Sequence, residues 1–138
     1  MNGEVPADRD ARPFVLPDWP APATVGALTT IRQGGQSRGP YGGFNLALHV
    51  GDDARAVLAN RGVLAARLGL PRPPRWLEQV HGARVIDAAD ATADGEADGA
   101  WTSVPGVACT VLTADCLPLL LCDRAGTRIA ALHCGWRG

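Results

Sequence analysis

Apolar runs alternate along this chain with polar segments rich in glycine and proline, and the alternation predicts where strands and loops lie. The prolines Pro17, Pro20 and Pro22 interrupt the first apolar run. Because proline cannot donate a hydrogen bond to a strand ladder, only the end of this run, 25–31, is predicted to form a strand. The segment 32–46 contains five glycines and a proline, and it is predicted to be a loop.

One segment has the pattern of a helix. Asp52 or Asp53 can cap its start, and Gly69 followed by Pro71 ends it. Between these limits the apolar residues recur at helical spacing: Val57, Leu58, Leu64, Ala65 and Leu68.

The second half of the chain is predicted to consist mainly of strands. The segment 75–88 indicates two short strands on either side of a His-Gly step, whereas the acidic segment 87–100 is predicted to be a solvated loop. The continuous apolar run 106–114 is typical of a buried strand. Two further apolar runs, 116–123 and 127–136, flank a turn and are predicted to pair as a hairpin. One helix among several strands predicts a mixed α/β or α+β domain.

The length of the hairpin loop decides whether Cys116 and His133 can meet. With a two-residue loop they lie directly opposite each other, where Cβ atoms are roughly 4.5–5.5 Å apart. A four-residue loop places them diagonally on the same face, and a three-residue loop places them on opposite faces. An even loop therefore predicts a shared site for a thiol and an imidazole.

Such a site supports zinc binding, because thiolate sulfur and imidazole nitrogen are both zinc ligands. His81 is the third candidate ligand, since it ends the polar part of the EQVHG segment. Three protein ligands with one open position are typical of catalytic zinc, whereas a structural zinc would need a fourth ligand.

Two other interpretations remain open from the residues alone. Cys116 could act as a nucleophile with His133 as its base and Asp115 as an orienting group. Alternatively, the glycine-rich loop could bind an anion, with Arg32 and Arg137 pairing with phosphate.

Composition narrows the classes of partner. The chain has 138 residues and a net charge of −1, so we expect no nucleic-acid partner and no basic membrane patch. Residues 1–13 are polar and acidic and are predicted to be a disordered leader without the apolar core of a signal peptide. We therefore expect a cytoplasmic location, where the four cysteines stay reduced.

Six motifs occur in the order found in the YfiH/DUF152 family of multicopper-polyphenol-oxidase-like laccase domains: TTIRQGG, GPYGGFNLALHVGDD, NRGVLAARLGLP, WLEQVHG, VLTADCLPLLLCD and HCGWRG. The chain resembles this family from about residue 27 to residue 138. The resemblance implies an α/β sandwich of mixed sheets flanked by helices. Family chains continue well past the HxGWRG motif, so we expect 14–138 to be the N-terminal part of a single, truncated domain.

The resemblance also implies which residues form the site. The metal ligands of the family fall on His81, Cys116 and His133, and zinc is the implied metal, with copper as the alternative that older family labels carry. The implied catalytic residues are Cys116, His133 and Asp115, and the expected substrate-binding residues are Arg32, Asn45 and Arg137.

The activity implied by the resemblance is that of a zinc-dependent purine nucleoside enzyme. Its expected partners are phosphate and the nucleosides adenosine, inosine, guanosine and methylthioadenosine, with deamination of adenosine as a second reaction. The alternatives are a hydrolase that edits peptidoglycan precursors, a metal-free Cys-His hydrolase, a copper polyphenol oxidase and an inactive fragment. Three histidines in the whole chain disfavour the oxidase, because laccase chemistry requires several coppers and many histidine ligands.

Overall fold

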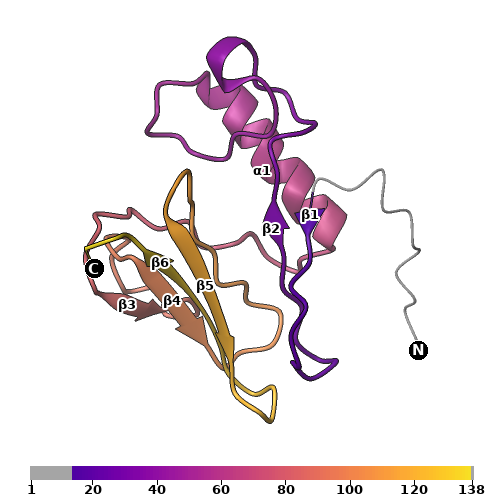
Figure 1. Ribbon diagram of the computed structural model, residues 1–138, viewed down its shortest axis with the longest axis vertical. Coiled ribbons are helices and arrows are strands. Elements are labelled where there is room, and N and C mark those ends of the chain that lie inside the picture. Colours follow the sequence, from indigo (N-terminus) through magenta and orange to yellow (C-terminus); the bar gives the residue numbers. More distant parts are fainter. Residues whose placement is uncertain (1–13, 138) are drawn as a thin grey trace.

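The computed structural model describes residues 14–137, and the predicted disordered leader, 1–13, lies outside this range. Figure 1 shows a helix beside a small two-stranded sheet, and a separate, larger sheet that leads to the C-terminus. In chain order the elements are β1 (Phe14–Val15), β2 (Thr29–Thr30), the short 3₁₀ helix η1 (Gly39–Tyr41), α1 (Ala54–Leu68), β3 (Val85–Asp87), β4 (Gly99–Thr102), β5 (Leu117–Cys122) and β6 (Ile129–Cys134).

The larger sheet is mixed and has the strand order β3-β4-β6-β5. β3 runs parallel to β4, and the other neighbours are antiparallel. The smaller sheet pairs β1 with β2. Two sheets and one helix confirm the predicted mixed α/β class. Among the described residues, no helix is long and apolar enough to span a membrane.

The predicted helix is confirmed as α1, and its ends follow from two residues. The Asp53 side chain accepts a hydrogen bond from the Arg55 backbone N–H at 2.9 Å and so caps the first turn. Gly69 adopts a left-handed conformation, φ 59°, and its N–H bonds back to carbonyls of the last turn.

The helix also anchors the predicted loop 32–46. Asn60 of α1 is fully buried, and its Nδ2 donates to Ser37 Oγ at 3.1 Å and to the Asn45 carbonyl at 2.9 Å. Its Oδ1 accepts from the Gln36 backbone N–H at 2.7 Å. One buried amide side chain therefore joins three polar groups of the glycine-rich loop to the helix.

The predicted hairpin is confirmed, and its loop has four residues. Cys122 pairs with Ile129 at one end and Pro118 pairs with His133 near the other, so Asp123 and Arg128 bound the loop. The Asp123 carboxylate accepts from the Thr127 backbone N–H at 2.7 Å and stabilises this turn.

Three strand predictions were wrong in detail. The apolar run 106–114 is not a strand in the structure: its middle is irregular, although Val107 and Cys109 pack against the core of the sheet. A strand requires a neighbour with free backbone groups, and no described strand pairs with this segment. The first strand predicted in 75–88 is reduced to a single bridge between Glu78 and Glu96. β1 was not predicted, because Pro17 disfavours a strand in this part of the chain. The pairing of β1 with β2 ends at Val15, two residues before that proline.

The predicted solvated loop, 87–100, was wrong at its end. Ala97 and Ala100 are fully buried, and Asp98 is 3 % exposed. Pairing of β4 with β6 buries this part of the acidic segment, and that long-range contact overrides the local composition.

The two faces of the larger sheet differ in how well they are covered. Ile86, Ala100 and Ala131 lie on one face and are buried. The alternating residues on the opposite face form an apolar surface that we call the outer face, and its large exposed members are Val85, Trp101, Leu117, Leu119 and Leu121. His133 shares the buried face, since it pairs with Pro118 next to the Leu120–Ala131 pair.

Candidate metal centre

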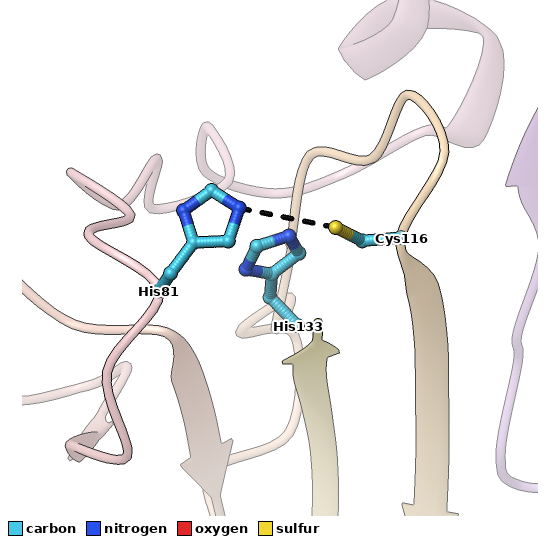
Figure 2. Close-up of side chains that lie close together, drawn as sticks. All are labelled: His81, Cys116 and His133. Carbon is cyan, nitrogen blue, oxygen red and sulfur yellow. Dashed lines mark hydrogen bonds between the residues drawn. The ribbon is translucent and has the colours of Figure 1, made fainter. Parts of the chain in front are cut away.

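His81, Cys116 and His133 converge at one end of the larger sheet (Figure 2). Each offers one ligand atom, and these three atoms all lie within 4.8 Å of one another. Cys116 Sγ is 3.8 Å from His81 Nε2, and the two imidazole rings pack edge to face with centroids 4.7 Å apart. The structure thus brings together all three residues that were predicted to be metal ligands.

Three separate segments supply these side chains. His133 lies near the end of β6 and is 9 % exposed, while Cys116 immediately precedes β5 and is half-buried. Because Pro118 is the residue opposite His133, Cys116 lies diagonally across the hairpin on the same face, as predicted for a four-residue loop. His81 approaches from the turn before β3 and is exposed.

The turn that carries His81 has a strained backbone. His81 has φ 59°, and it is the one described non-glycine residue with positive φ. This conformation costs roughly 1–2 kcal/mol per residue for L-amino acids, so the surroundings must hold it in place. Three consecutive backbone N–H groups of the turn donate to Asp98: Val80 at 3.1 Å, His81 at 2.9 Å and Gly82 at 2.8 Å.

Asp98 contacts a second member of the cluster as well. Its Oδ1 lies 2.8 Å from His133 Nδ1, and the side chains are 2 % and 4 % exposed respectively. Burial opposes ionisation of Asp98, but the hydrogen bonds from His133 and the three backbone N–H groups outweigh it and hold the pKa of this carboxyl below its usual value. Asp98 therefore remains a carboxylate at neutral pH.

Sequence reasoning missed Asp98, because it ends a run of acidic and small residues that looks solvated. The stretch Gly99–Thr102, which directly follows Asp98, could have been read as a short buried strand and would then have placed Asp98 at the start of that strand. An aspartate at the start of a buried strand is costly unless hydrogen bonds satisfy it, and such a position indicates a specific polar role.

The cluster opens into a cavity of about 340 Å³. Asp115 and Arg137, both predicted site residues, line it. Asp115 Oδ1 lies 3.9 Å from Cys116 Sγ, and the Arg137 guanidinium lies 4.2 Å from the centre of the Trp136 ring. The cavity therefore combines the three ligand atoms with one carboxylate and one cation.

Arg32 and Asn45 lie elsewhere. Arg32 donates to the carbonyls of Gly42 and Pro40 at 3.0 and 2.8 Å, and Asn45 donates to Asp52 at 3.0 Å. Both stabilise the glycine-rich loop, and neither lines the cavity. Their role in substrate binding stays a prediction.

The donor set fits zinc. Bonds of about 2.3 Å to sulfur and 2.0–2.1 Å to nitrogen, at a tetrahedral angle, place the two ligand atoms about 3.6 Å apart. The observed distance between Cys116 Sγ and His81 Nε2, 3.8 Å, is close to this value. Two nitrogen donors and one sulfur donor, with the cavity on the fourth side, match the open coordination of a catalytic site.

Comparison with known proteins defines the family. The family model described as multi-copper polyphenol oxidoreductase laccase matches residues 26–138. The chain belongs to this family, YfiH/DUF152.

Relatives in the family are about twice as long as this chain. A protein of Pseudomonas aeruginosa named purine nucleoside phosphorylase is 54% identical over 125 residues, which cover 91% of this chain and 50% of the relative. Purine nucleoside phosphorylase YfiH of Escherichia coli K12 is 47% identical over 126 residues, or 91% of this chain and 52% of the relative. The chain spans about half the length of the curated relatives it matches.

Solved structures show the same fold. A DUF152 protein of Neisseria meningitidis is 48% identical, has a TM-score of 0.86, and is matched over 92% of this chain and 52% of its own. YlmD of Geobacillus stearothermophilus is 34% identical, has a TM-score of 0.77, and is matched over 94% and 52%.

Proposed function

We propose that this chain forms the metal-binding half of a purine nucleoside phosphorylase, with zinc held by His81, Cys116 and His133. The observation that carries the proposal is the convergence of three ligand atoms, within 4.8 Å of one another, on the wall of one cavity. The names of two relatives supply the reaction, transfer of a purine nucleoside's ribosyl group to phosphate. The substrates proposed are adenosine, inosine, guanosine and methylthioadenosine.

Bound zinc would supply Lewis acidity at the cavity wall. Arg137 would hold the phosphate, because a guanidinium at the cavity rim pairs well with phosphate oxygens. The attacking phosphate forms a bond to the ribose C1′ as the bond to the purine nitrogen breaks, and the departing base takes up a proton. Asp115 lines the same cavity and is proposed to carry protons there. Arg32 and Asn45 are proposed to act on substrate from the glycine-rich loop.

Adenosine deamination is the second candidate, and the position of Asp115 favours it. A carboxylate beside the ligand cluster can move a proton between an attacking water and the departing ammonia. Deamination consumes water and needs no phosphate, so the two reactions are separable by their products.

A copper polyphenol oxidase is not favoured by the site. Groups of three or more histidine, cysteine, aspartate or glutamate side chains could hold a metal. Within residues 14–137 there is one such group, formed by His81, Cys116 and His133. One three-ligand group cannot hold the several coppers that laccase chemistry requires.

We further propose that 14–138 is the N-terminal part of one domain, completed by a segment that covers the outer face. Five large apolar side chains are exposed there, and Leu117 reaches 65 % exposure. An apolar surface of this kind on a folded chain is usually covered by another segment or chain.

The metal content and a phosphate-dependence assay of the chain joined to the segment that completes its domain test the proposal together. We expect about one zinc per chain, and release of hypoxanthine from inosine only when phosphate is present, with ribose 1-phosphate as the second product. Ammonia release from adenosine without phosphate would identify the deaminase instead. Turnover by metal-free protein would support a Cys-His hydrolase and contradict the zinc assignment.

A further inference from the structure

Asp98 touches the segments of two different candidate ligands through one buried carboxylate. Oδ1 is shared by the His81 backbone N–H and His133 Nδ1, at 2.9 and 2.8 Å. Oδ2 is shared by the backbone N–H groups of Val80 and Gly82, at 3.1 and 2.8 Å. A carboxylate has about four lone-pair sites, so these four contacts use its whole acceptor capacity.

The main chain of Asp98 joins the same two segments. Its N–H donates to the Arg84 carbonyl at 3.0 Å, in the turn that follows His81. Its carbonyl accepts from the His133 N–H at 2.7 Å. Asp98 is therefore fixed by both segments, and a change in its side chain acts on both.

These contacts favour one protonated form of the His133 ring. Three of the four groups around the carboxylate are backbone N–H donors, which can only donate, so the carboxylate accepts from all of them. A carboxylate can only accept, so across the 2.8 Å contact a proton on His133 Nδ1 is the arrangement that this acceptor favours. The other ring nitrogen, Nε2, is left with its lone pair for the ligand cluster.

The same carboxylate holds the strained turn at His81. Without this acceptor, the three N–H groups of Val80, His81 and Gly82 would lose the hydrogen bonds that offset the cost of the positive φ at His81. The direction in which the His81 side chain points follows from this backbone conformation.

We propose that Asp98 is a positioning residue for the site: it selects the Nδ1-protonated form of His133 and, at the same time, holds the turn that aims His81 at Cys116. The part that concerns metal rests on the proposed function, whereas the ring protonation and the turn geometry do not.

Metal-free protein, labelled with ¹⁵N, provides the first test. Long-range ¹H–¹⁵N spectra of the imidazoles should show neutral His133 protonated on Nδ1, and the amides of Val80, His81 and Gly82 should be slow to exchange. In Asp98→Asn the carboxamide nitrogen opposes these donors, so the three amides should exchange faster and the preference for Nδ1–H should weaken. Asp87→Asn is the matched control, because Asp87 caps the next turn through Ala89 and does not touch the cluster.

Cobalt binding provides the second test. The wild type and Asp87→Asn should bind Co²⁺ with the same visible d–d spectrum, and Asp98→Asn should bind it about 10–100-fold more weakly with an altered spectrum. Absence of Co²⁺ binding by the wild type would overturn the metal proposal but leave the ring protonation to be tested by NMR.

A wild-type His133 protonated on Nε2 would overturn the positioning role, even if Asp98→Asn does not fold. Unchanged amide exchange, ring protonation and Co²⁺ affinity in a folded Asp98→Asn would overturn it as well.

Discussion

Cys116 stands diagonally across the β5–β6 hairpin from His133, because the four-residue loop makes Pro118 the partner of that histidine. A loop shorter or longer by one residue would place the thiol and the imidazole on opposite faces of the sheet. The local chemistry of a turn thus determines whether the candidate metal centre can exist, although the turn lies at the far end of the hairpin. Asp123 and Thr127, which hold this turn, contribute to the site without contacting it.

Replacement of Asn60 by alanine should destabilise the protein by about 2–3 kcal/mol. The change removes the buried amide that the Gln36 N–H, the Ser37 hydroxyl and the Asn45 carbonyl share, and it leaves a cavity in its place. Chemical denaturation measures the loss. Leu58→Ala on the same helix is the control, because Leu58 is 56 % exposed and should change stability little. Equal effects of the two substitutions would show that Asn60 does not anchor the loop.

Cys109 should resist alkylation. Burial raises the pKa of its thiol to about 12, with Asp87 adding to the effect. At pH 8 its thiolate fraction should be about 1,000-fold below that of a free thiol whose pKa is near 9, and iodoacetamide labelling followed by mass spectrometry should be slower in proportion. Labelling in denaturant, where the pKa returns to its ordinary value, is the control.

The raised pKa of Cys109 also fixes the sign of a pH effect on stability. The folded protein holds this proton more tightly than the unfolded chain does. The contribution of Cys109 to folding stability is therefore complete below about pH 9 and is lost as the pH rises towards 12. If the pH dependence of stability between pH 9 and 12 is the same in Cys109→Ala as in the wild type, Cys109 does not make this contribution.

The outer face should drive self-association of this chain when it is produced alone. Leu119 and Leu121 are exposed on that face, on the edge strand β5. Light scattering after size exclusion should show species larger than one chain at micromolar concentration, and Leu119→Lys with Leu121→Glu should shift them towards the monomer. A cooperatively folding wild-type monomer would contradict the proposal that another segment covers this face.

The elements that could be predicted from the sequence are those fixed by nearby residues. Asp53 and Gly69 define the helix ends, and the turn at Asp123 defines the hairpin, because capping and turn chemistry act within a few positions. These local signals predicted the hairpin but left its loop length open, and the observed register is what places Cys116 and His133 on one face.

The remaining features depend on contacts between distant segments. β4 and Asp98 follow a run of acidic residues and become buried only because β6 pairs beside them. The apolar run 106–114 has the composition of a strand, but no described strand lies beside it to pair with. Its side chains are therefore buried by packing against the core, without hydrogen bonds to a neighbouring strand. The role of Asp98, whose carboxylate contacts two candidate ligands, therefore could not be predicted from the residues next to it in the sequence.

Cys116→Ser, made in the full-length protein that includes the completing segment, tests the central claim most directly. A serine hydroxyl does not ionise as a thiol does and is a poor zinc ligand at neutral pH, while the side chains are nearly the same size. Zinc per chain and phosphate-dependent inosine cleavage should therefore fall together while the fold persists, and Cys122→Ser, a half-buried thiol outside the cavity, should leave both unchanged. Loss of cleavage with zinc retained would indicate a metal-free nucleophile, and unchanged zinc and cleavage in Cys116→Ser would contradict the metal centre itself.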